Sequence, residues 1–223
     1  IEEVNKAVIG KESEIKLSVT CLLAKGHLLI DDIPGVGKTT LAKALARAIG
    51  GVFKRIQFTP DLLPSDITGG YVFNPKENVF VFQPGPLFAN IVLADEINRA
   101  SPRTQASLLE CMEERQVTSD GITHKLPEPF AVIATENRVE HYGVYPLPEA
   151  ELDRFMMRIS LGYPDKESEE EIVRNHQQLD DLVEKVNMVA TPEVTIAIQE
   201  EVKEVYVSPA VQNYIVELVR ATR

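Results

Sequence analysis

The sequence predicts an α/β protein in which a parallel β-sheet is flanked by helices. Short apolar runs rich in β-branched residues alternate with helical or loop sequence, and near-continuous apolarity is typical of strands covered on both faces. These runs cover residues 53–58, 90–94 and 130–134, with shorter ones at 27–30 and 158–161. A chain of 223 residues, 44% hydrophobic and 26% charged, is long enough to bury the core of such a fold.

Helices are predicted where apolar side chains recur at helical spacing. Residues 12–23 form one such segment, which Gly26 ends before the first strand. A second follows the glycine-rich segment after that strand and stops at Gly50-Gly51. Strand, glycine loop and helix in this order make half of a βαβ unit.

Two stretches interrupt the alternation of strand and helix. Residues 71–82 surround Asn74-Pro75, and residues 117–126 surround Asp120-Gly121, a strong hairpin turn dipeptide. We therefore expect two β-hairpins inserted into the α/β frame.

The composition changes near Pro164. An acidic helical run at 165–171 follows it, strand patterning nearly disappears, and Ser208-Pro209 opens an amphipathic helix. The sequence thus predicts an α/β core over residues 1–163 and a helical segment over residues 164–223.

Charge and cysteine content exclude several classes of protein. The net charge of -11 and the pI near 4.9 disfavour a nucleic-acid partner, because the field repels a phosphate backbone. Cys21 and Cys111 both fall in predicted helices, so neither a disulfide framework nor a zinc site is indicated. No apolar run approaches the roughly 18 residues of a membrane span, and the N-terminal residues do not resemble a secretory signal. We expect a cytoplasmic protein without a membrane span.

The most informative segment is the glycine loop that follows the first strand. Glycines let backbone N–H groups approach a triphosphate, Lys38 can reach the β- and γ-phosphates, and the Thr39 hydroxyl can hold Mg²⁺. Asp32 replaces the first glycine of the usual G-x-x-x-x-G-K-[ST] pattern, so its carboxylate must point away from the phosphates. The alternative is a strand-to-helix turn with a surface lysine. The predicted nucleotide-binding residues are Pro34, Gly35, Val36, Gly37, Lys38, Thr39 and Thr40.

A second part of the site is predicted where an apolar strand ends in Asp95-Glu96. Such a strand delivers both carboxylates to the carboxyl edge of the sheet, where ligands of these folds bind. Asp95 would hold Mg²⁺, directly or through water, together with Thr39, and Glu96 would orient and deprotonate the attacking water. The alternative is that the pair caps the next helix.

Five sequence motifs accompany the glycine loop: QFTPDLLPSD at 57–66, LADEINRA at 93–100, QASLLE at 105–110, MEERQV at 112–117 and YPLPEAELDRF at 145–155. Together they resemble the MoxR family of AAA+ ATPases, and the resemblance covers the chain almost from Val8 to Arg223. Loops of this family often carry an acidic residue where Asp32 stands.

The resemblance implies two more site residues. Asn137 would be the sensor 1 residue that hydrogen-bonds the γ-phosphate or the lytic water, although alone it resembles a turn residue. Arg154 would be the arginine finger that reaches the nucleotide of a neighbouring subunit; the alternative is a surface ion pair with Glu151 or Asp153. A sensor 2 arginine is absent from the Ser208-Pro209-Ala210 frame and would lie beyond Arg223, so the helical lid is expected to be partial here.

The resemblance also implies an activity and partners. MoxR-like proteins are expected to form rings, here a hexamer, and to couple Mg²⁺-dependent ATP hydrolysis to chaperone-like remodelling of another protein, commonly with a von Willebrand factor A domain partner. The two hairpins match the helix-2 insert and the pre-sensor-1 hairpin of a clade that includes chelatases and minichromosome-maintenance helicases. Phe73, Phe80 and Phe82 of the first hairpin either face substrate or pack on their own domain.

Two other functions stay open at this point. A nucleic-acid motor would share the loop and hairpins but would concentrate basic residues on them, whereas the sequence offers Lys76 on the first hairpin and His124-Lys125 on the second. A nucleotide-gated binding module without turnover would need neither Glu96 nor Arg154.

Overall fold

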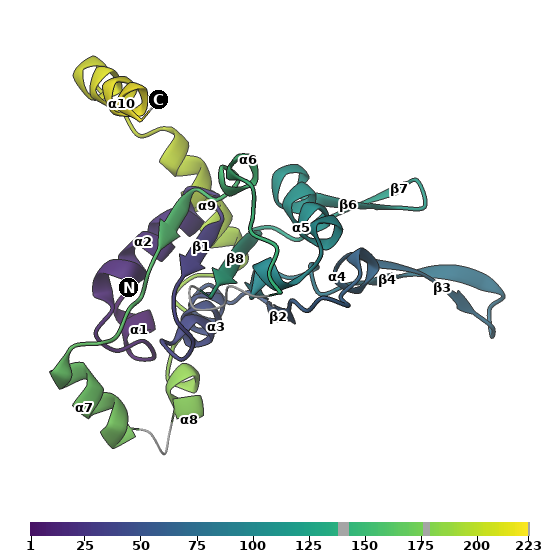
Figure 1. The fold of residues 1–223 in the computed structure, drawn as a ribbon, viewed down its shortest axis with the longest axis horizontal. Coiled ribbons are helices and arrows are strands. Elements are labelled where there is room, and N and C mark those ends of the chain that lie inside the picture. Colours follow the sequence, from purple (N-terminus) through teal and green to yellow (C-terminus); the bar gives the residue numbers. More distant parts are fainter. Residues whose placement is uncertain (138–142, 176–178, 223) are drawn as a thin grey trace.

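A five-stranded parallel sheet forms the centre of the molecule (Figure 1). The computed structural model describes residues 1–137, 143–175 and 179–222. The strand order is β2-β5-β8-β1-β9, and every neighbouring pair is parallel. All five predicted runs are therefore strands of one sheet: β1 (Leu28–Asp31), β2 (Phe53–Gln57), β5 (Ile91–Asp95), β8 (Ala131–Glu136) and β9 (Met157–Ile159).

Each face of the sheet is covered by its own apolar cluster. Along β5 the side chains alternate between the two, because Ile91 and Leu93 belong to one cluster while Val92 and Ala94 belong to the other. This two-sided burial confirms the parallel sheet predicted from continuous apolarity. The first cluster packs beneath α1 (Glu2–Asn5), α2 (Glu12–Leu23) and α3 (Lys38–Ala48), and the second beneath η1 (Ile97–Arg99), α4 (Pro64–Thr68) and α5 (Pro102–Glu114).

Both predicted hairpins are present and project from the same end of the molecule (Figure 1). The first consists of β3 (Gly69–Asn74) and β4 (Val79–Pro84), and the second of β6 (Gln116–Ser119) and β7 (Ile122–Lys125). Phe82 stacks on His124 with ring centroids 3.8 Å apart, so this ring packs between the hairpins. Phe73 and Phe80 contact each other nearer the tip, where Phe80 is 68% exposed.

The segment after Pro164 is helical, as predicted. It contains α7 (Lys166–Asn175), α8 (Leu179–Glu184), α9 (Pro192–Lys203) and α10 (Pro209–Ala221), and it follows the short α6 (Glu149–Leu152) and β9. The Gln199 amide donates to the carbonyl oxygen of Leu22, which attaches α9 to α2. In contrast, every residue of α10 is exposed, and Figure 1 shows this helix standing away from the sheet. The boundary near Pro164 stays a prediction.

Within the described residues no helix is both long enough and apolar enough to cross a membrane. Cys21 and Cys111 are free thiols buried in α2 and α5, as the sequence predicted.

His27 joins three elements at the start of β1. The backbone N–H of Val132 donates to its Nδ1 at 2.9 Å, so the ring proton sits on Nε2, which donates to the Met112 carbonyl oxygen at 3.1 Å. Burial lowers the pKa of His27 to about 4, against the opposing effect of the Met112 hydrogen bond. The neutral ring is therefore a structural part of the core.

Acidification should destabilise the protein through His27. A histidine whose folded pKa lies below its ordinary value of 6.5 binds more protons when unfolded, so its contribution is complete above about pH 7 and is lost as the pH falls. Between pH 7 and pH 5 this loss is about 2 kcal/mol of the free energy of unfolding. Urea denaturation at both pH values should show a smaller loss for His27→Gln; an equal loss in both proteins would contradict this role.

Candidate active site

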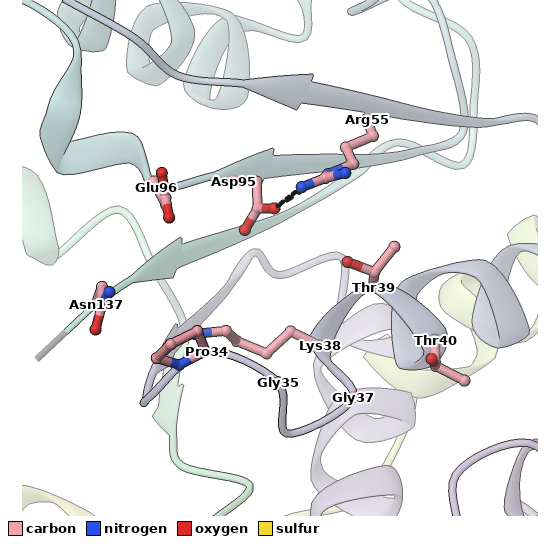
Figure 2. A pocket seen from close by; sticks show the side chains of 10 residues that line it. All are labelled: Pro34, Gly35, Gly37, Lys38, Thr39, Thr40, Arg55, Asp95, Glu96 and Asn137. Carbon is pink, nitrogen blue, oxygen red and sulfur yellow. Dashed lines mark hydrogen bonds and ion pairs between the residues drawn. The ribbon is translucent and has the colours of Figure 1, made fainter. Parts of the chain in front are cut away.

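A cleft of about 390 Å³ opens where the glycine loop meets the carboxyl ends of the central strands (Figure 2). The structure brings together nine of the predicted residues and adds Arg55, which the sequence analysis did not single out. The lining residues are Pro34, Gly35, Gly37, Lys38, Thr39, Thr40, Arg55, Asp95, Glu96 and Asn137.

The loop conformation depends on two glycines. Gly35 and Gly37 have φ angles of 87° and 94°, a region that favours glycine. A Cβ built on either would meet no heavy atom within 4 Å, so the backbone angle rather than crowding restricts these positions. Gly37 caps the N-terminus of α3, whose unpaired N–H groups and dipole attract anions.

Lys38 reaches back across the loop. Its Nζ donates to the carbonyl oxygen of Asp32 at 2.8 Å. Burial lowers the pKa of Lys38, while the charges of Asp32 and Asp95 oppose that effect. The site thus holds a partly desolvated cation beside the helix N-terminus, which suits phosphate binding.

Asp32, the departure from the usual loop pattern, points toward the end of the sheet. Its Oδ2 accepts hydrogen bonds from the Gly162 N–H at 2.6 Å and the Ser160 hydroxyl at 3.0 Å, and its Oδ1 accepts from the Ile33 N–H at 2.8 Å. Burial raises the pKa of this carboxyl, but the hydrogen bonds outweigh it and the net shift is downward. Asp32 therefore anchors the loop to residues 160–162.

Thr135 of β8 positions both carboxylates. Its hydroxyl donates to Asp95 Oδ1 at 2.6 Å and accepts from the Glu96 N–H at 2.8 Å. Glu96 has a φ of 56°, a left-handed conformation that is strained for a residue with a side chain. This turn ends β5 and lets the two adjacent side chains both reach the cleft.

Neighbouring side chains hold the two carboxylates further. Arg55 donates to Asp95 Oδ2 from Nε at 3.0 Å and from Nη2 at 2.6 Å (Figure 2). Glu96 Oε2 accepts from the Gln57 amide at 2.8 Å and from Arg99 at 2.9 Å. Gln57 belongs to the QFTPDLLPSD motif, but the sequence predicts no site role for it or for Arg55, because a polar residue on an exposed strand is ordinary.

The oxygen donors of the cleft fit Mg²⁺. The Thr39 hydroxyl and the Asp95 carboxylate line the same cavity, and both are hard ligands. Across the described residues, no group of three or more His, Cys, Asp or Glu side chains is arranged to hold a metal ion. This donor set suits a cation that takes most of its ligands from phosphates and water, as Mg²⁺ commonly does.

The other two predicted catalytic residues lie in different places. Asn137 directly follows β8, the strand between β5 and β1, and lines the cleft. Arg154 does not line it: its described partners are the Glu113 carboxylate and the Leu109 carbonyl oxygen on α5, rather than the Glu151 or Asp153 of the alternative reading.

A second cavity of about 610 Å³ adjoins the cleft and shares Gly35, Gly37, Thr39 and Thr40 with it. Its other walls are mostly apolar and come from the N-terminal segment, the loop and the helices after Pro164. They include Val8, Ile9, Val36, Ile172, Val173, Leu182 and Val183. The sequence did not predict this pocket, because the N-terminal segment and the helices after Pro164 carry no motif and meet the glycine loop only in the folded chain.

Comparisons with known proteins agree on the family. A family described as "ATPase family associated with various cellular activities (AAA)" matches residues 27–157. Chaperone MoxR1 of Mycobacterium tuberculosis is 42% identical over 223 residues, which are all of this chain and 58% of that protein. The chain belongs to the MoxR family of AAA+ ATPases.

Two further relatives extend the match. YeaC of Bacillus subtilis, an uncharacterised protein, is 50% identical over 223 residues, which are all of this chain and 69% of YeaC. A crystal structure of a candidate ATPase from Cytophaga hutchinsonii superposes with a TM-score of 0.90 at 43% identity, covering all of this chain and 67% of that one. The MoxR-family chain described here thus spans between about 58% and 69% of these three relatives.

Replacing Asp32 by glycine should destabilise this MoxR-family protein, although it restores the usual loop pattern. Asp32→Gly leaves the Gly162 N–H and the Ser160 hydroxyl without their acceptor, which should cost about 1–3 kcal/mol of the free energy of unfolding. Asp32→Asn, which keeps one acceptor oxygen, should lose less. Urea denaturation of the three proteins tests this, and a glycine variant as stable as the parent would refute it.

Proposed function

We propose that this chain hydrolyses ATP with Mg²⁺ and uses the energy to remodel or assemble a partner protein complex. The observation that carries the proposal is the convergence of Lys38, Thr39, Asp95 and Glu96 on one cleft at the N-terminus of α3. Binding phosphate requires the first two residues, whereas hydrolysis requires the carboxylates as well.

ATP would occupy both adjoining cavities. The triphosphate would lie on residues 34–40, where glycine N–H groups, Lys38 and the helix dipole oppose its charge. The apolar cavity bounded by Val8 and Val36 suits an uncharged, flat nucleobase, because such surfaces bury apolar rings and leave the phosphates to the polar cleft. The shared wall at Gly35–Gly37 supports a single ligand that spans the two.

Glu96 would act on the attacking water. Its carboxylate would accept the water proton as the water oxygen bonds to the γ-phosphorus, while the bond from that phosphorus to the β,γ-bridging oxygen breaks and ADP leaves. Gln57 and Arg99 fix the carboxylate through Oε2. Asn137 would orient the water or the γ-phosphate.

Mg²⁺, held through Thr39 and Asp95, would neutralise phosphate charge when bound. The strained backbone at Glu96 supports these separate roles, because it lets two adjacent carboxylates reach the cleft. Asp95 would bind the metal ion and Glu96 would act on the water.

Arg154 would complete the site of a neighbouring subunit in a ring, which we propose to be a hexamer. It does not line the cleft of its own chain and is held on α5, consistent with a role in trans. The exposed Phe73–Phe80 pair at the tip of the first hairpin would contact the remodelled protein, and a von Willebrand factor A domain protein is the partner we propose. Two buried free thiols suit the reducing cytoplasm, the proposed location.

Lys38 and Glu96 should separate binding from hydrolysis. Lys38→Ala removes a cation that contacts phosphates in the ground state, so it should lose ATP binding. Glu96→Gln should retain binding but lose turnover, because it keeps the side-chain volume and removes only the base. Titration with a fluorescent ATP analogue alongside an ATPase assay separates the two, and equal affinities in both variants would argue against the site.

Arg154 should act between subunits. Arg154→Ala should bind ATP nearly normally but lose roughly a thousandfold or more in kcat, the scale on which supplied arginine fingers act. Mixing it with Glu96→Gln should restore activity, because some interfaces then pair an intact Glu96 with an intact Arg154. Turnover of the parent protein should also fall on dilution.

Glu113→Ala is the matched control for this experiment, since it breaks the same intrachain ion pair and keeps the guanidinium. It should retain much more activity than Arg154→Ala. An equal loss in the two single variants, or parental turnover in Arg154→Ala, would assign Arg154 to an ordinary surface ion pair.

A further inference from the structure

Both side-chain oxygens of Asp95 are engaged by the protein itself. Oδ1 accepts the Thr135 hydroxyl, and Oδ2 accepts two N–H groups of Arg55. Thr135 is a neutral donor that a metal-bound carboxylate can retain. Arg55, however, places a full positive charge against the Asp95 carboxylate, which lines the cleft together with Thr39 (Figure 2).

The position of Arg55 follows from the register of β2 on β5. Arg55 pairs with Leu93 and Gln57 with Asp95, so these two alternate residues of β2 present their side chains on one face. Arg55 Nη2 also donates to Gln57 Oε1 at 2.8 Å, and the Gln57 amide donates to Glu96. The hydrogen-bonded side chains of Arg55 and Gln57 on β2 thus contact both carboxylates at the end of β5.

A divalent cation that binds Asp95 directly through Oδ2 would compete with the guanidinium for this oxygen. Two cations in contact with one carboxylate oxygen repel each other, and a partly buried site screens that repulsion less than water does. The Arg55 side chain is 49% exposed while that of Asp95 is 14% exposed. Because the Arg55 side chain is half-exposed, water can replace its hydrogen bonds to Asp95 when a metal ion displaces it.

We propose that Arg55 is the resting counter-ion of Asp95, which the metal–nucleotide complex displaces, so that Arg55 sets the Mg²⁺ concentration at which the site loads. The inference rests on the proposed ATPase function and assigns a regulatory role within its metal site. Arg55 neutralises Asp95 before loading and prevents a free carboxylate from repelling the incoming triphosphate.

Binding of Mn²⁺ as a spectroscopic substitute for Mg²⁺ tests this without relying on turnover. The free Mn²⁺ signal in electron paramagnetic resonance is titrated with the parent protein and with Arg55→Met, each saturated with β,γ-imido ATP. Arg55→Met should bind Mn²⁺ roughly threefold to tenfold more tightly, because its carboxylate no longer has a competing cation. Arg55→Lys keeps the positive charge but loses the bidentate contact with Asp95, so its Mn²⁺ affinity should lie between those of the parent and Arg55→Met.

Lys54→Met is the matched control. It removes one positive charge from the adjacent, exposed position of β2, and Lys54 is not among the lining residues of the cleft. Its Mn²⁺ affinity should stay within twofold of the parent value. If Lys54→Met and Arg55→Met gain Mn²⁺ affinity equally, the gain comes from the change in net charge alone, and the proposal is overturned.

The remaining outcomes separate this proposal from the function on which it rests. If the parent binds neither the analogue nor Mn²⁺, the proposed function fails. If the parent binds both but Arg55→Met binds Mn²⁺ equally or less tightly, only the counter-ion role fails. A loss of analogue affinity at saturating Mn²⁺ without tighter Mn²⁺ binding would instead make Arg55 a phosphate ligand.

Discussion

The pairing of β8 with two strands at once determines the geometry of the site. Ala134 is in register with Leu29 of β1 on one side and with Ala94 of β5 on the other. That register brings the next residue, Thr135, within hydrogen-bonding distance of Asp95 and Glu96, while the neighbouring β1 leads into the glycine loop. A shift of β8 by one residue would turn Thr135 to the other face, because strand side chains alternate. The arrangement of side chains in the cleft therefore depends on the same hydrogen bonds that hold the sheet together.

Charge is distributed unevenly in this acidic protein. With a net charge of -11, the molecule as a whole repels a triphosphate, so binding relies on local features. Asp32 and Asp31 are buried beside the loop, but hydrogen bonds from residues 160–162 and the ion pair with Arg158 counter their charges. Burial and the nearby Asp31 raise the pKa of Glu136, while Arg158 opposes that effect. The cleft thus presents Lys38 and a helix N-terminus to an anion despite its many carboxylates.

The parts of the fold that sequence could predict are those coded by local patterns. Continuous apolar runs predicted the five strands, and Asp120-Gly121 predicted the second hairpin. Both predictions were possible because each pattern lies within a few consecutive residues. The meeting of the glycine loop and Asp95-Glu96 at one cleft could be predicted, because both segments follow strands of one parallel sheet and end at the same edge. The ion pair of Arg154 with Glu113 could not, since 41 residues separate the partners and either acid beside Arg154 was equally plausible. Arg55 was missed for the same reason, as its role arises only from the pairing of β2 with β5.

The bonds of Asp32 make a mechanical connection between distant parts of the chain. The Asp32 carboxylate belongs to the glycine loop, yet two of its hydrogen bonds hold Ser160 and Gly162, which lie just after β9 where the chain runs toward α7. The loop cannot move at this point without breaking those bonds or pulling residues 160–162 with it. A glycine at position 32 would let the loop move independently of the segment that follows the sheet. With aspartate there, a movement of the loop that keeps these bonds must also move residues 160–162, where the chain turns toward the helical segment.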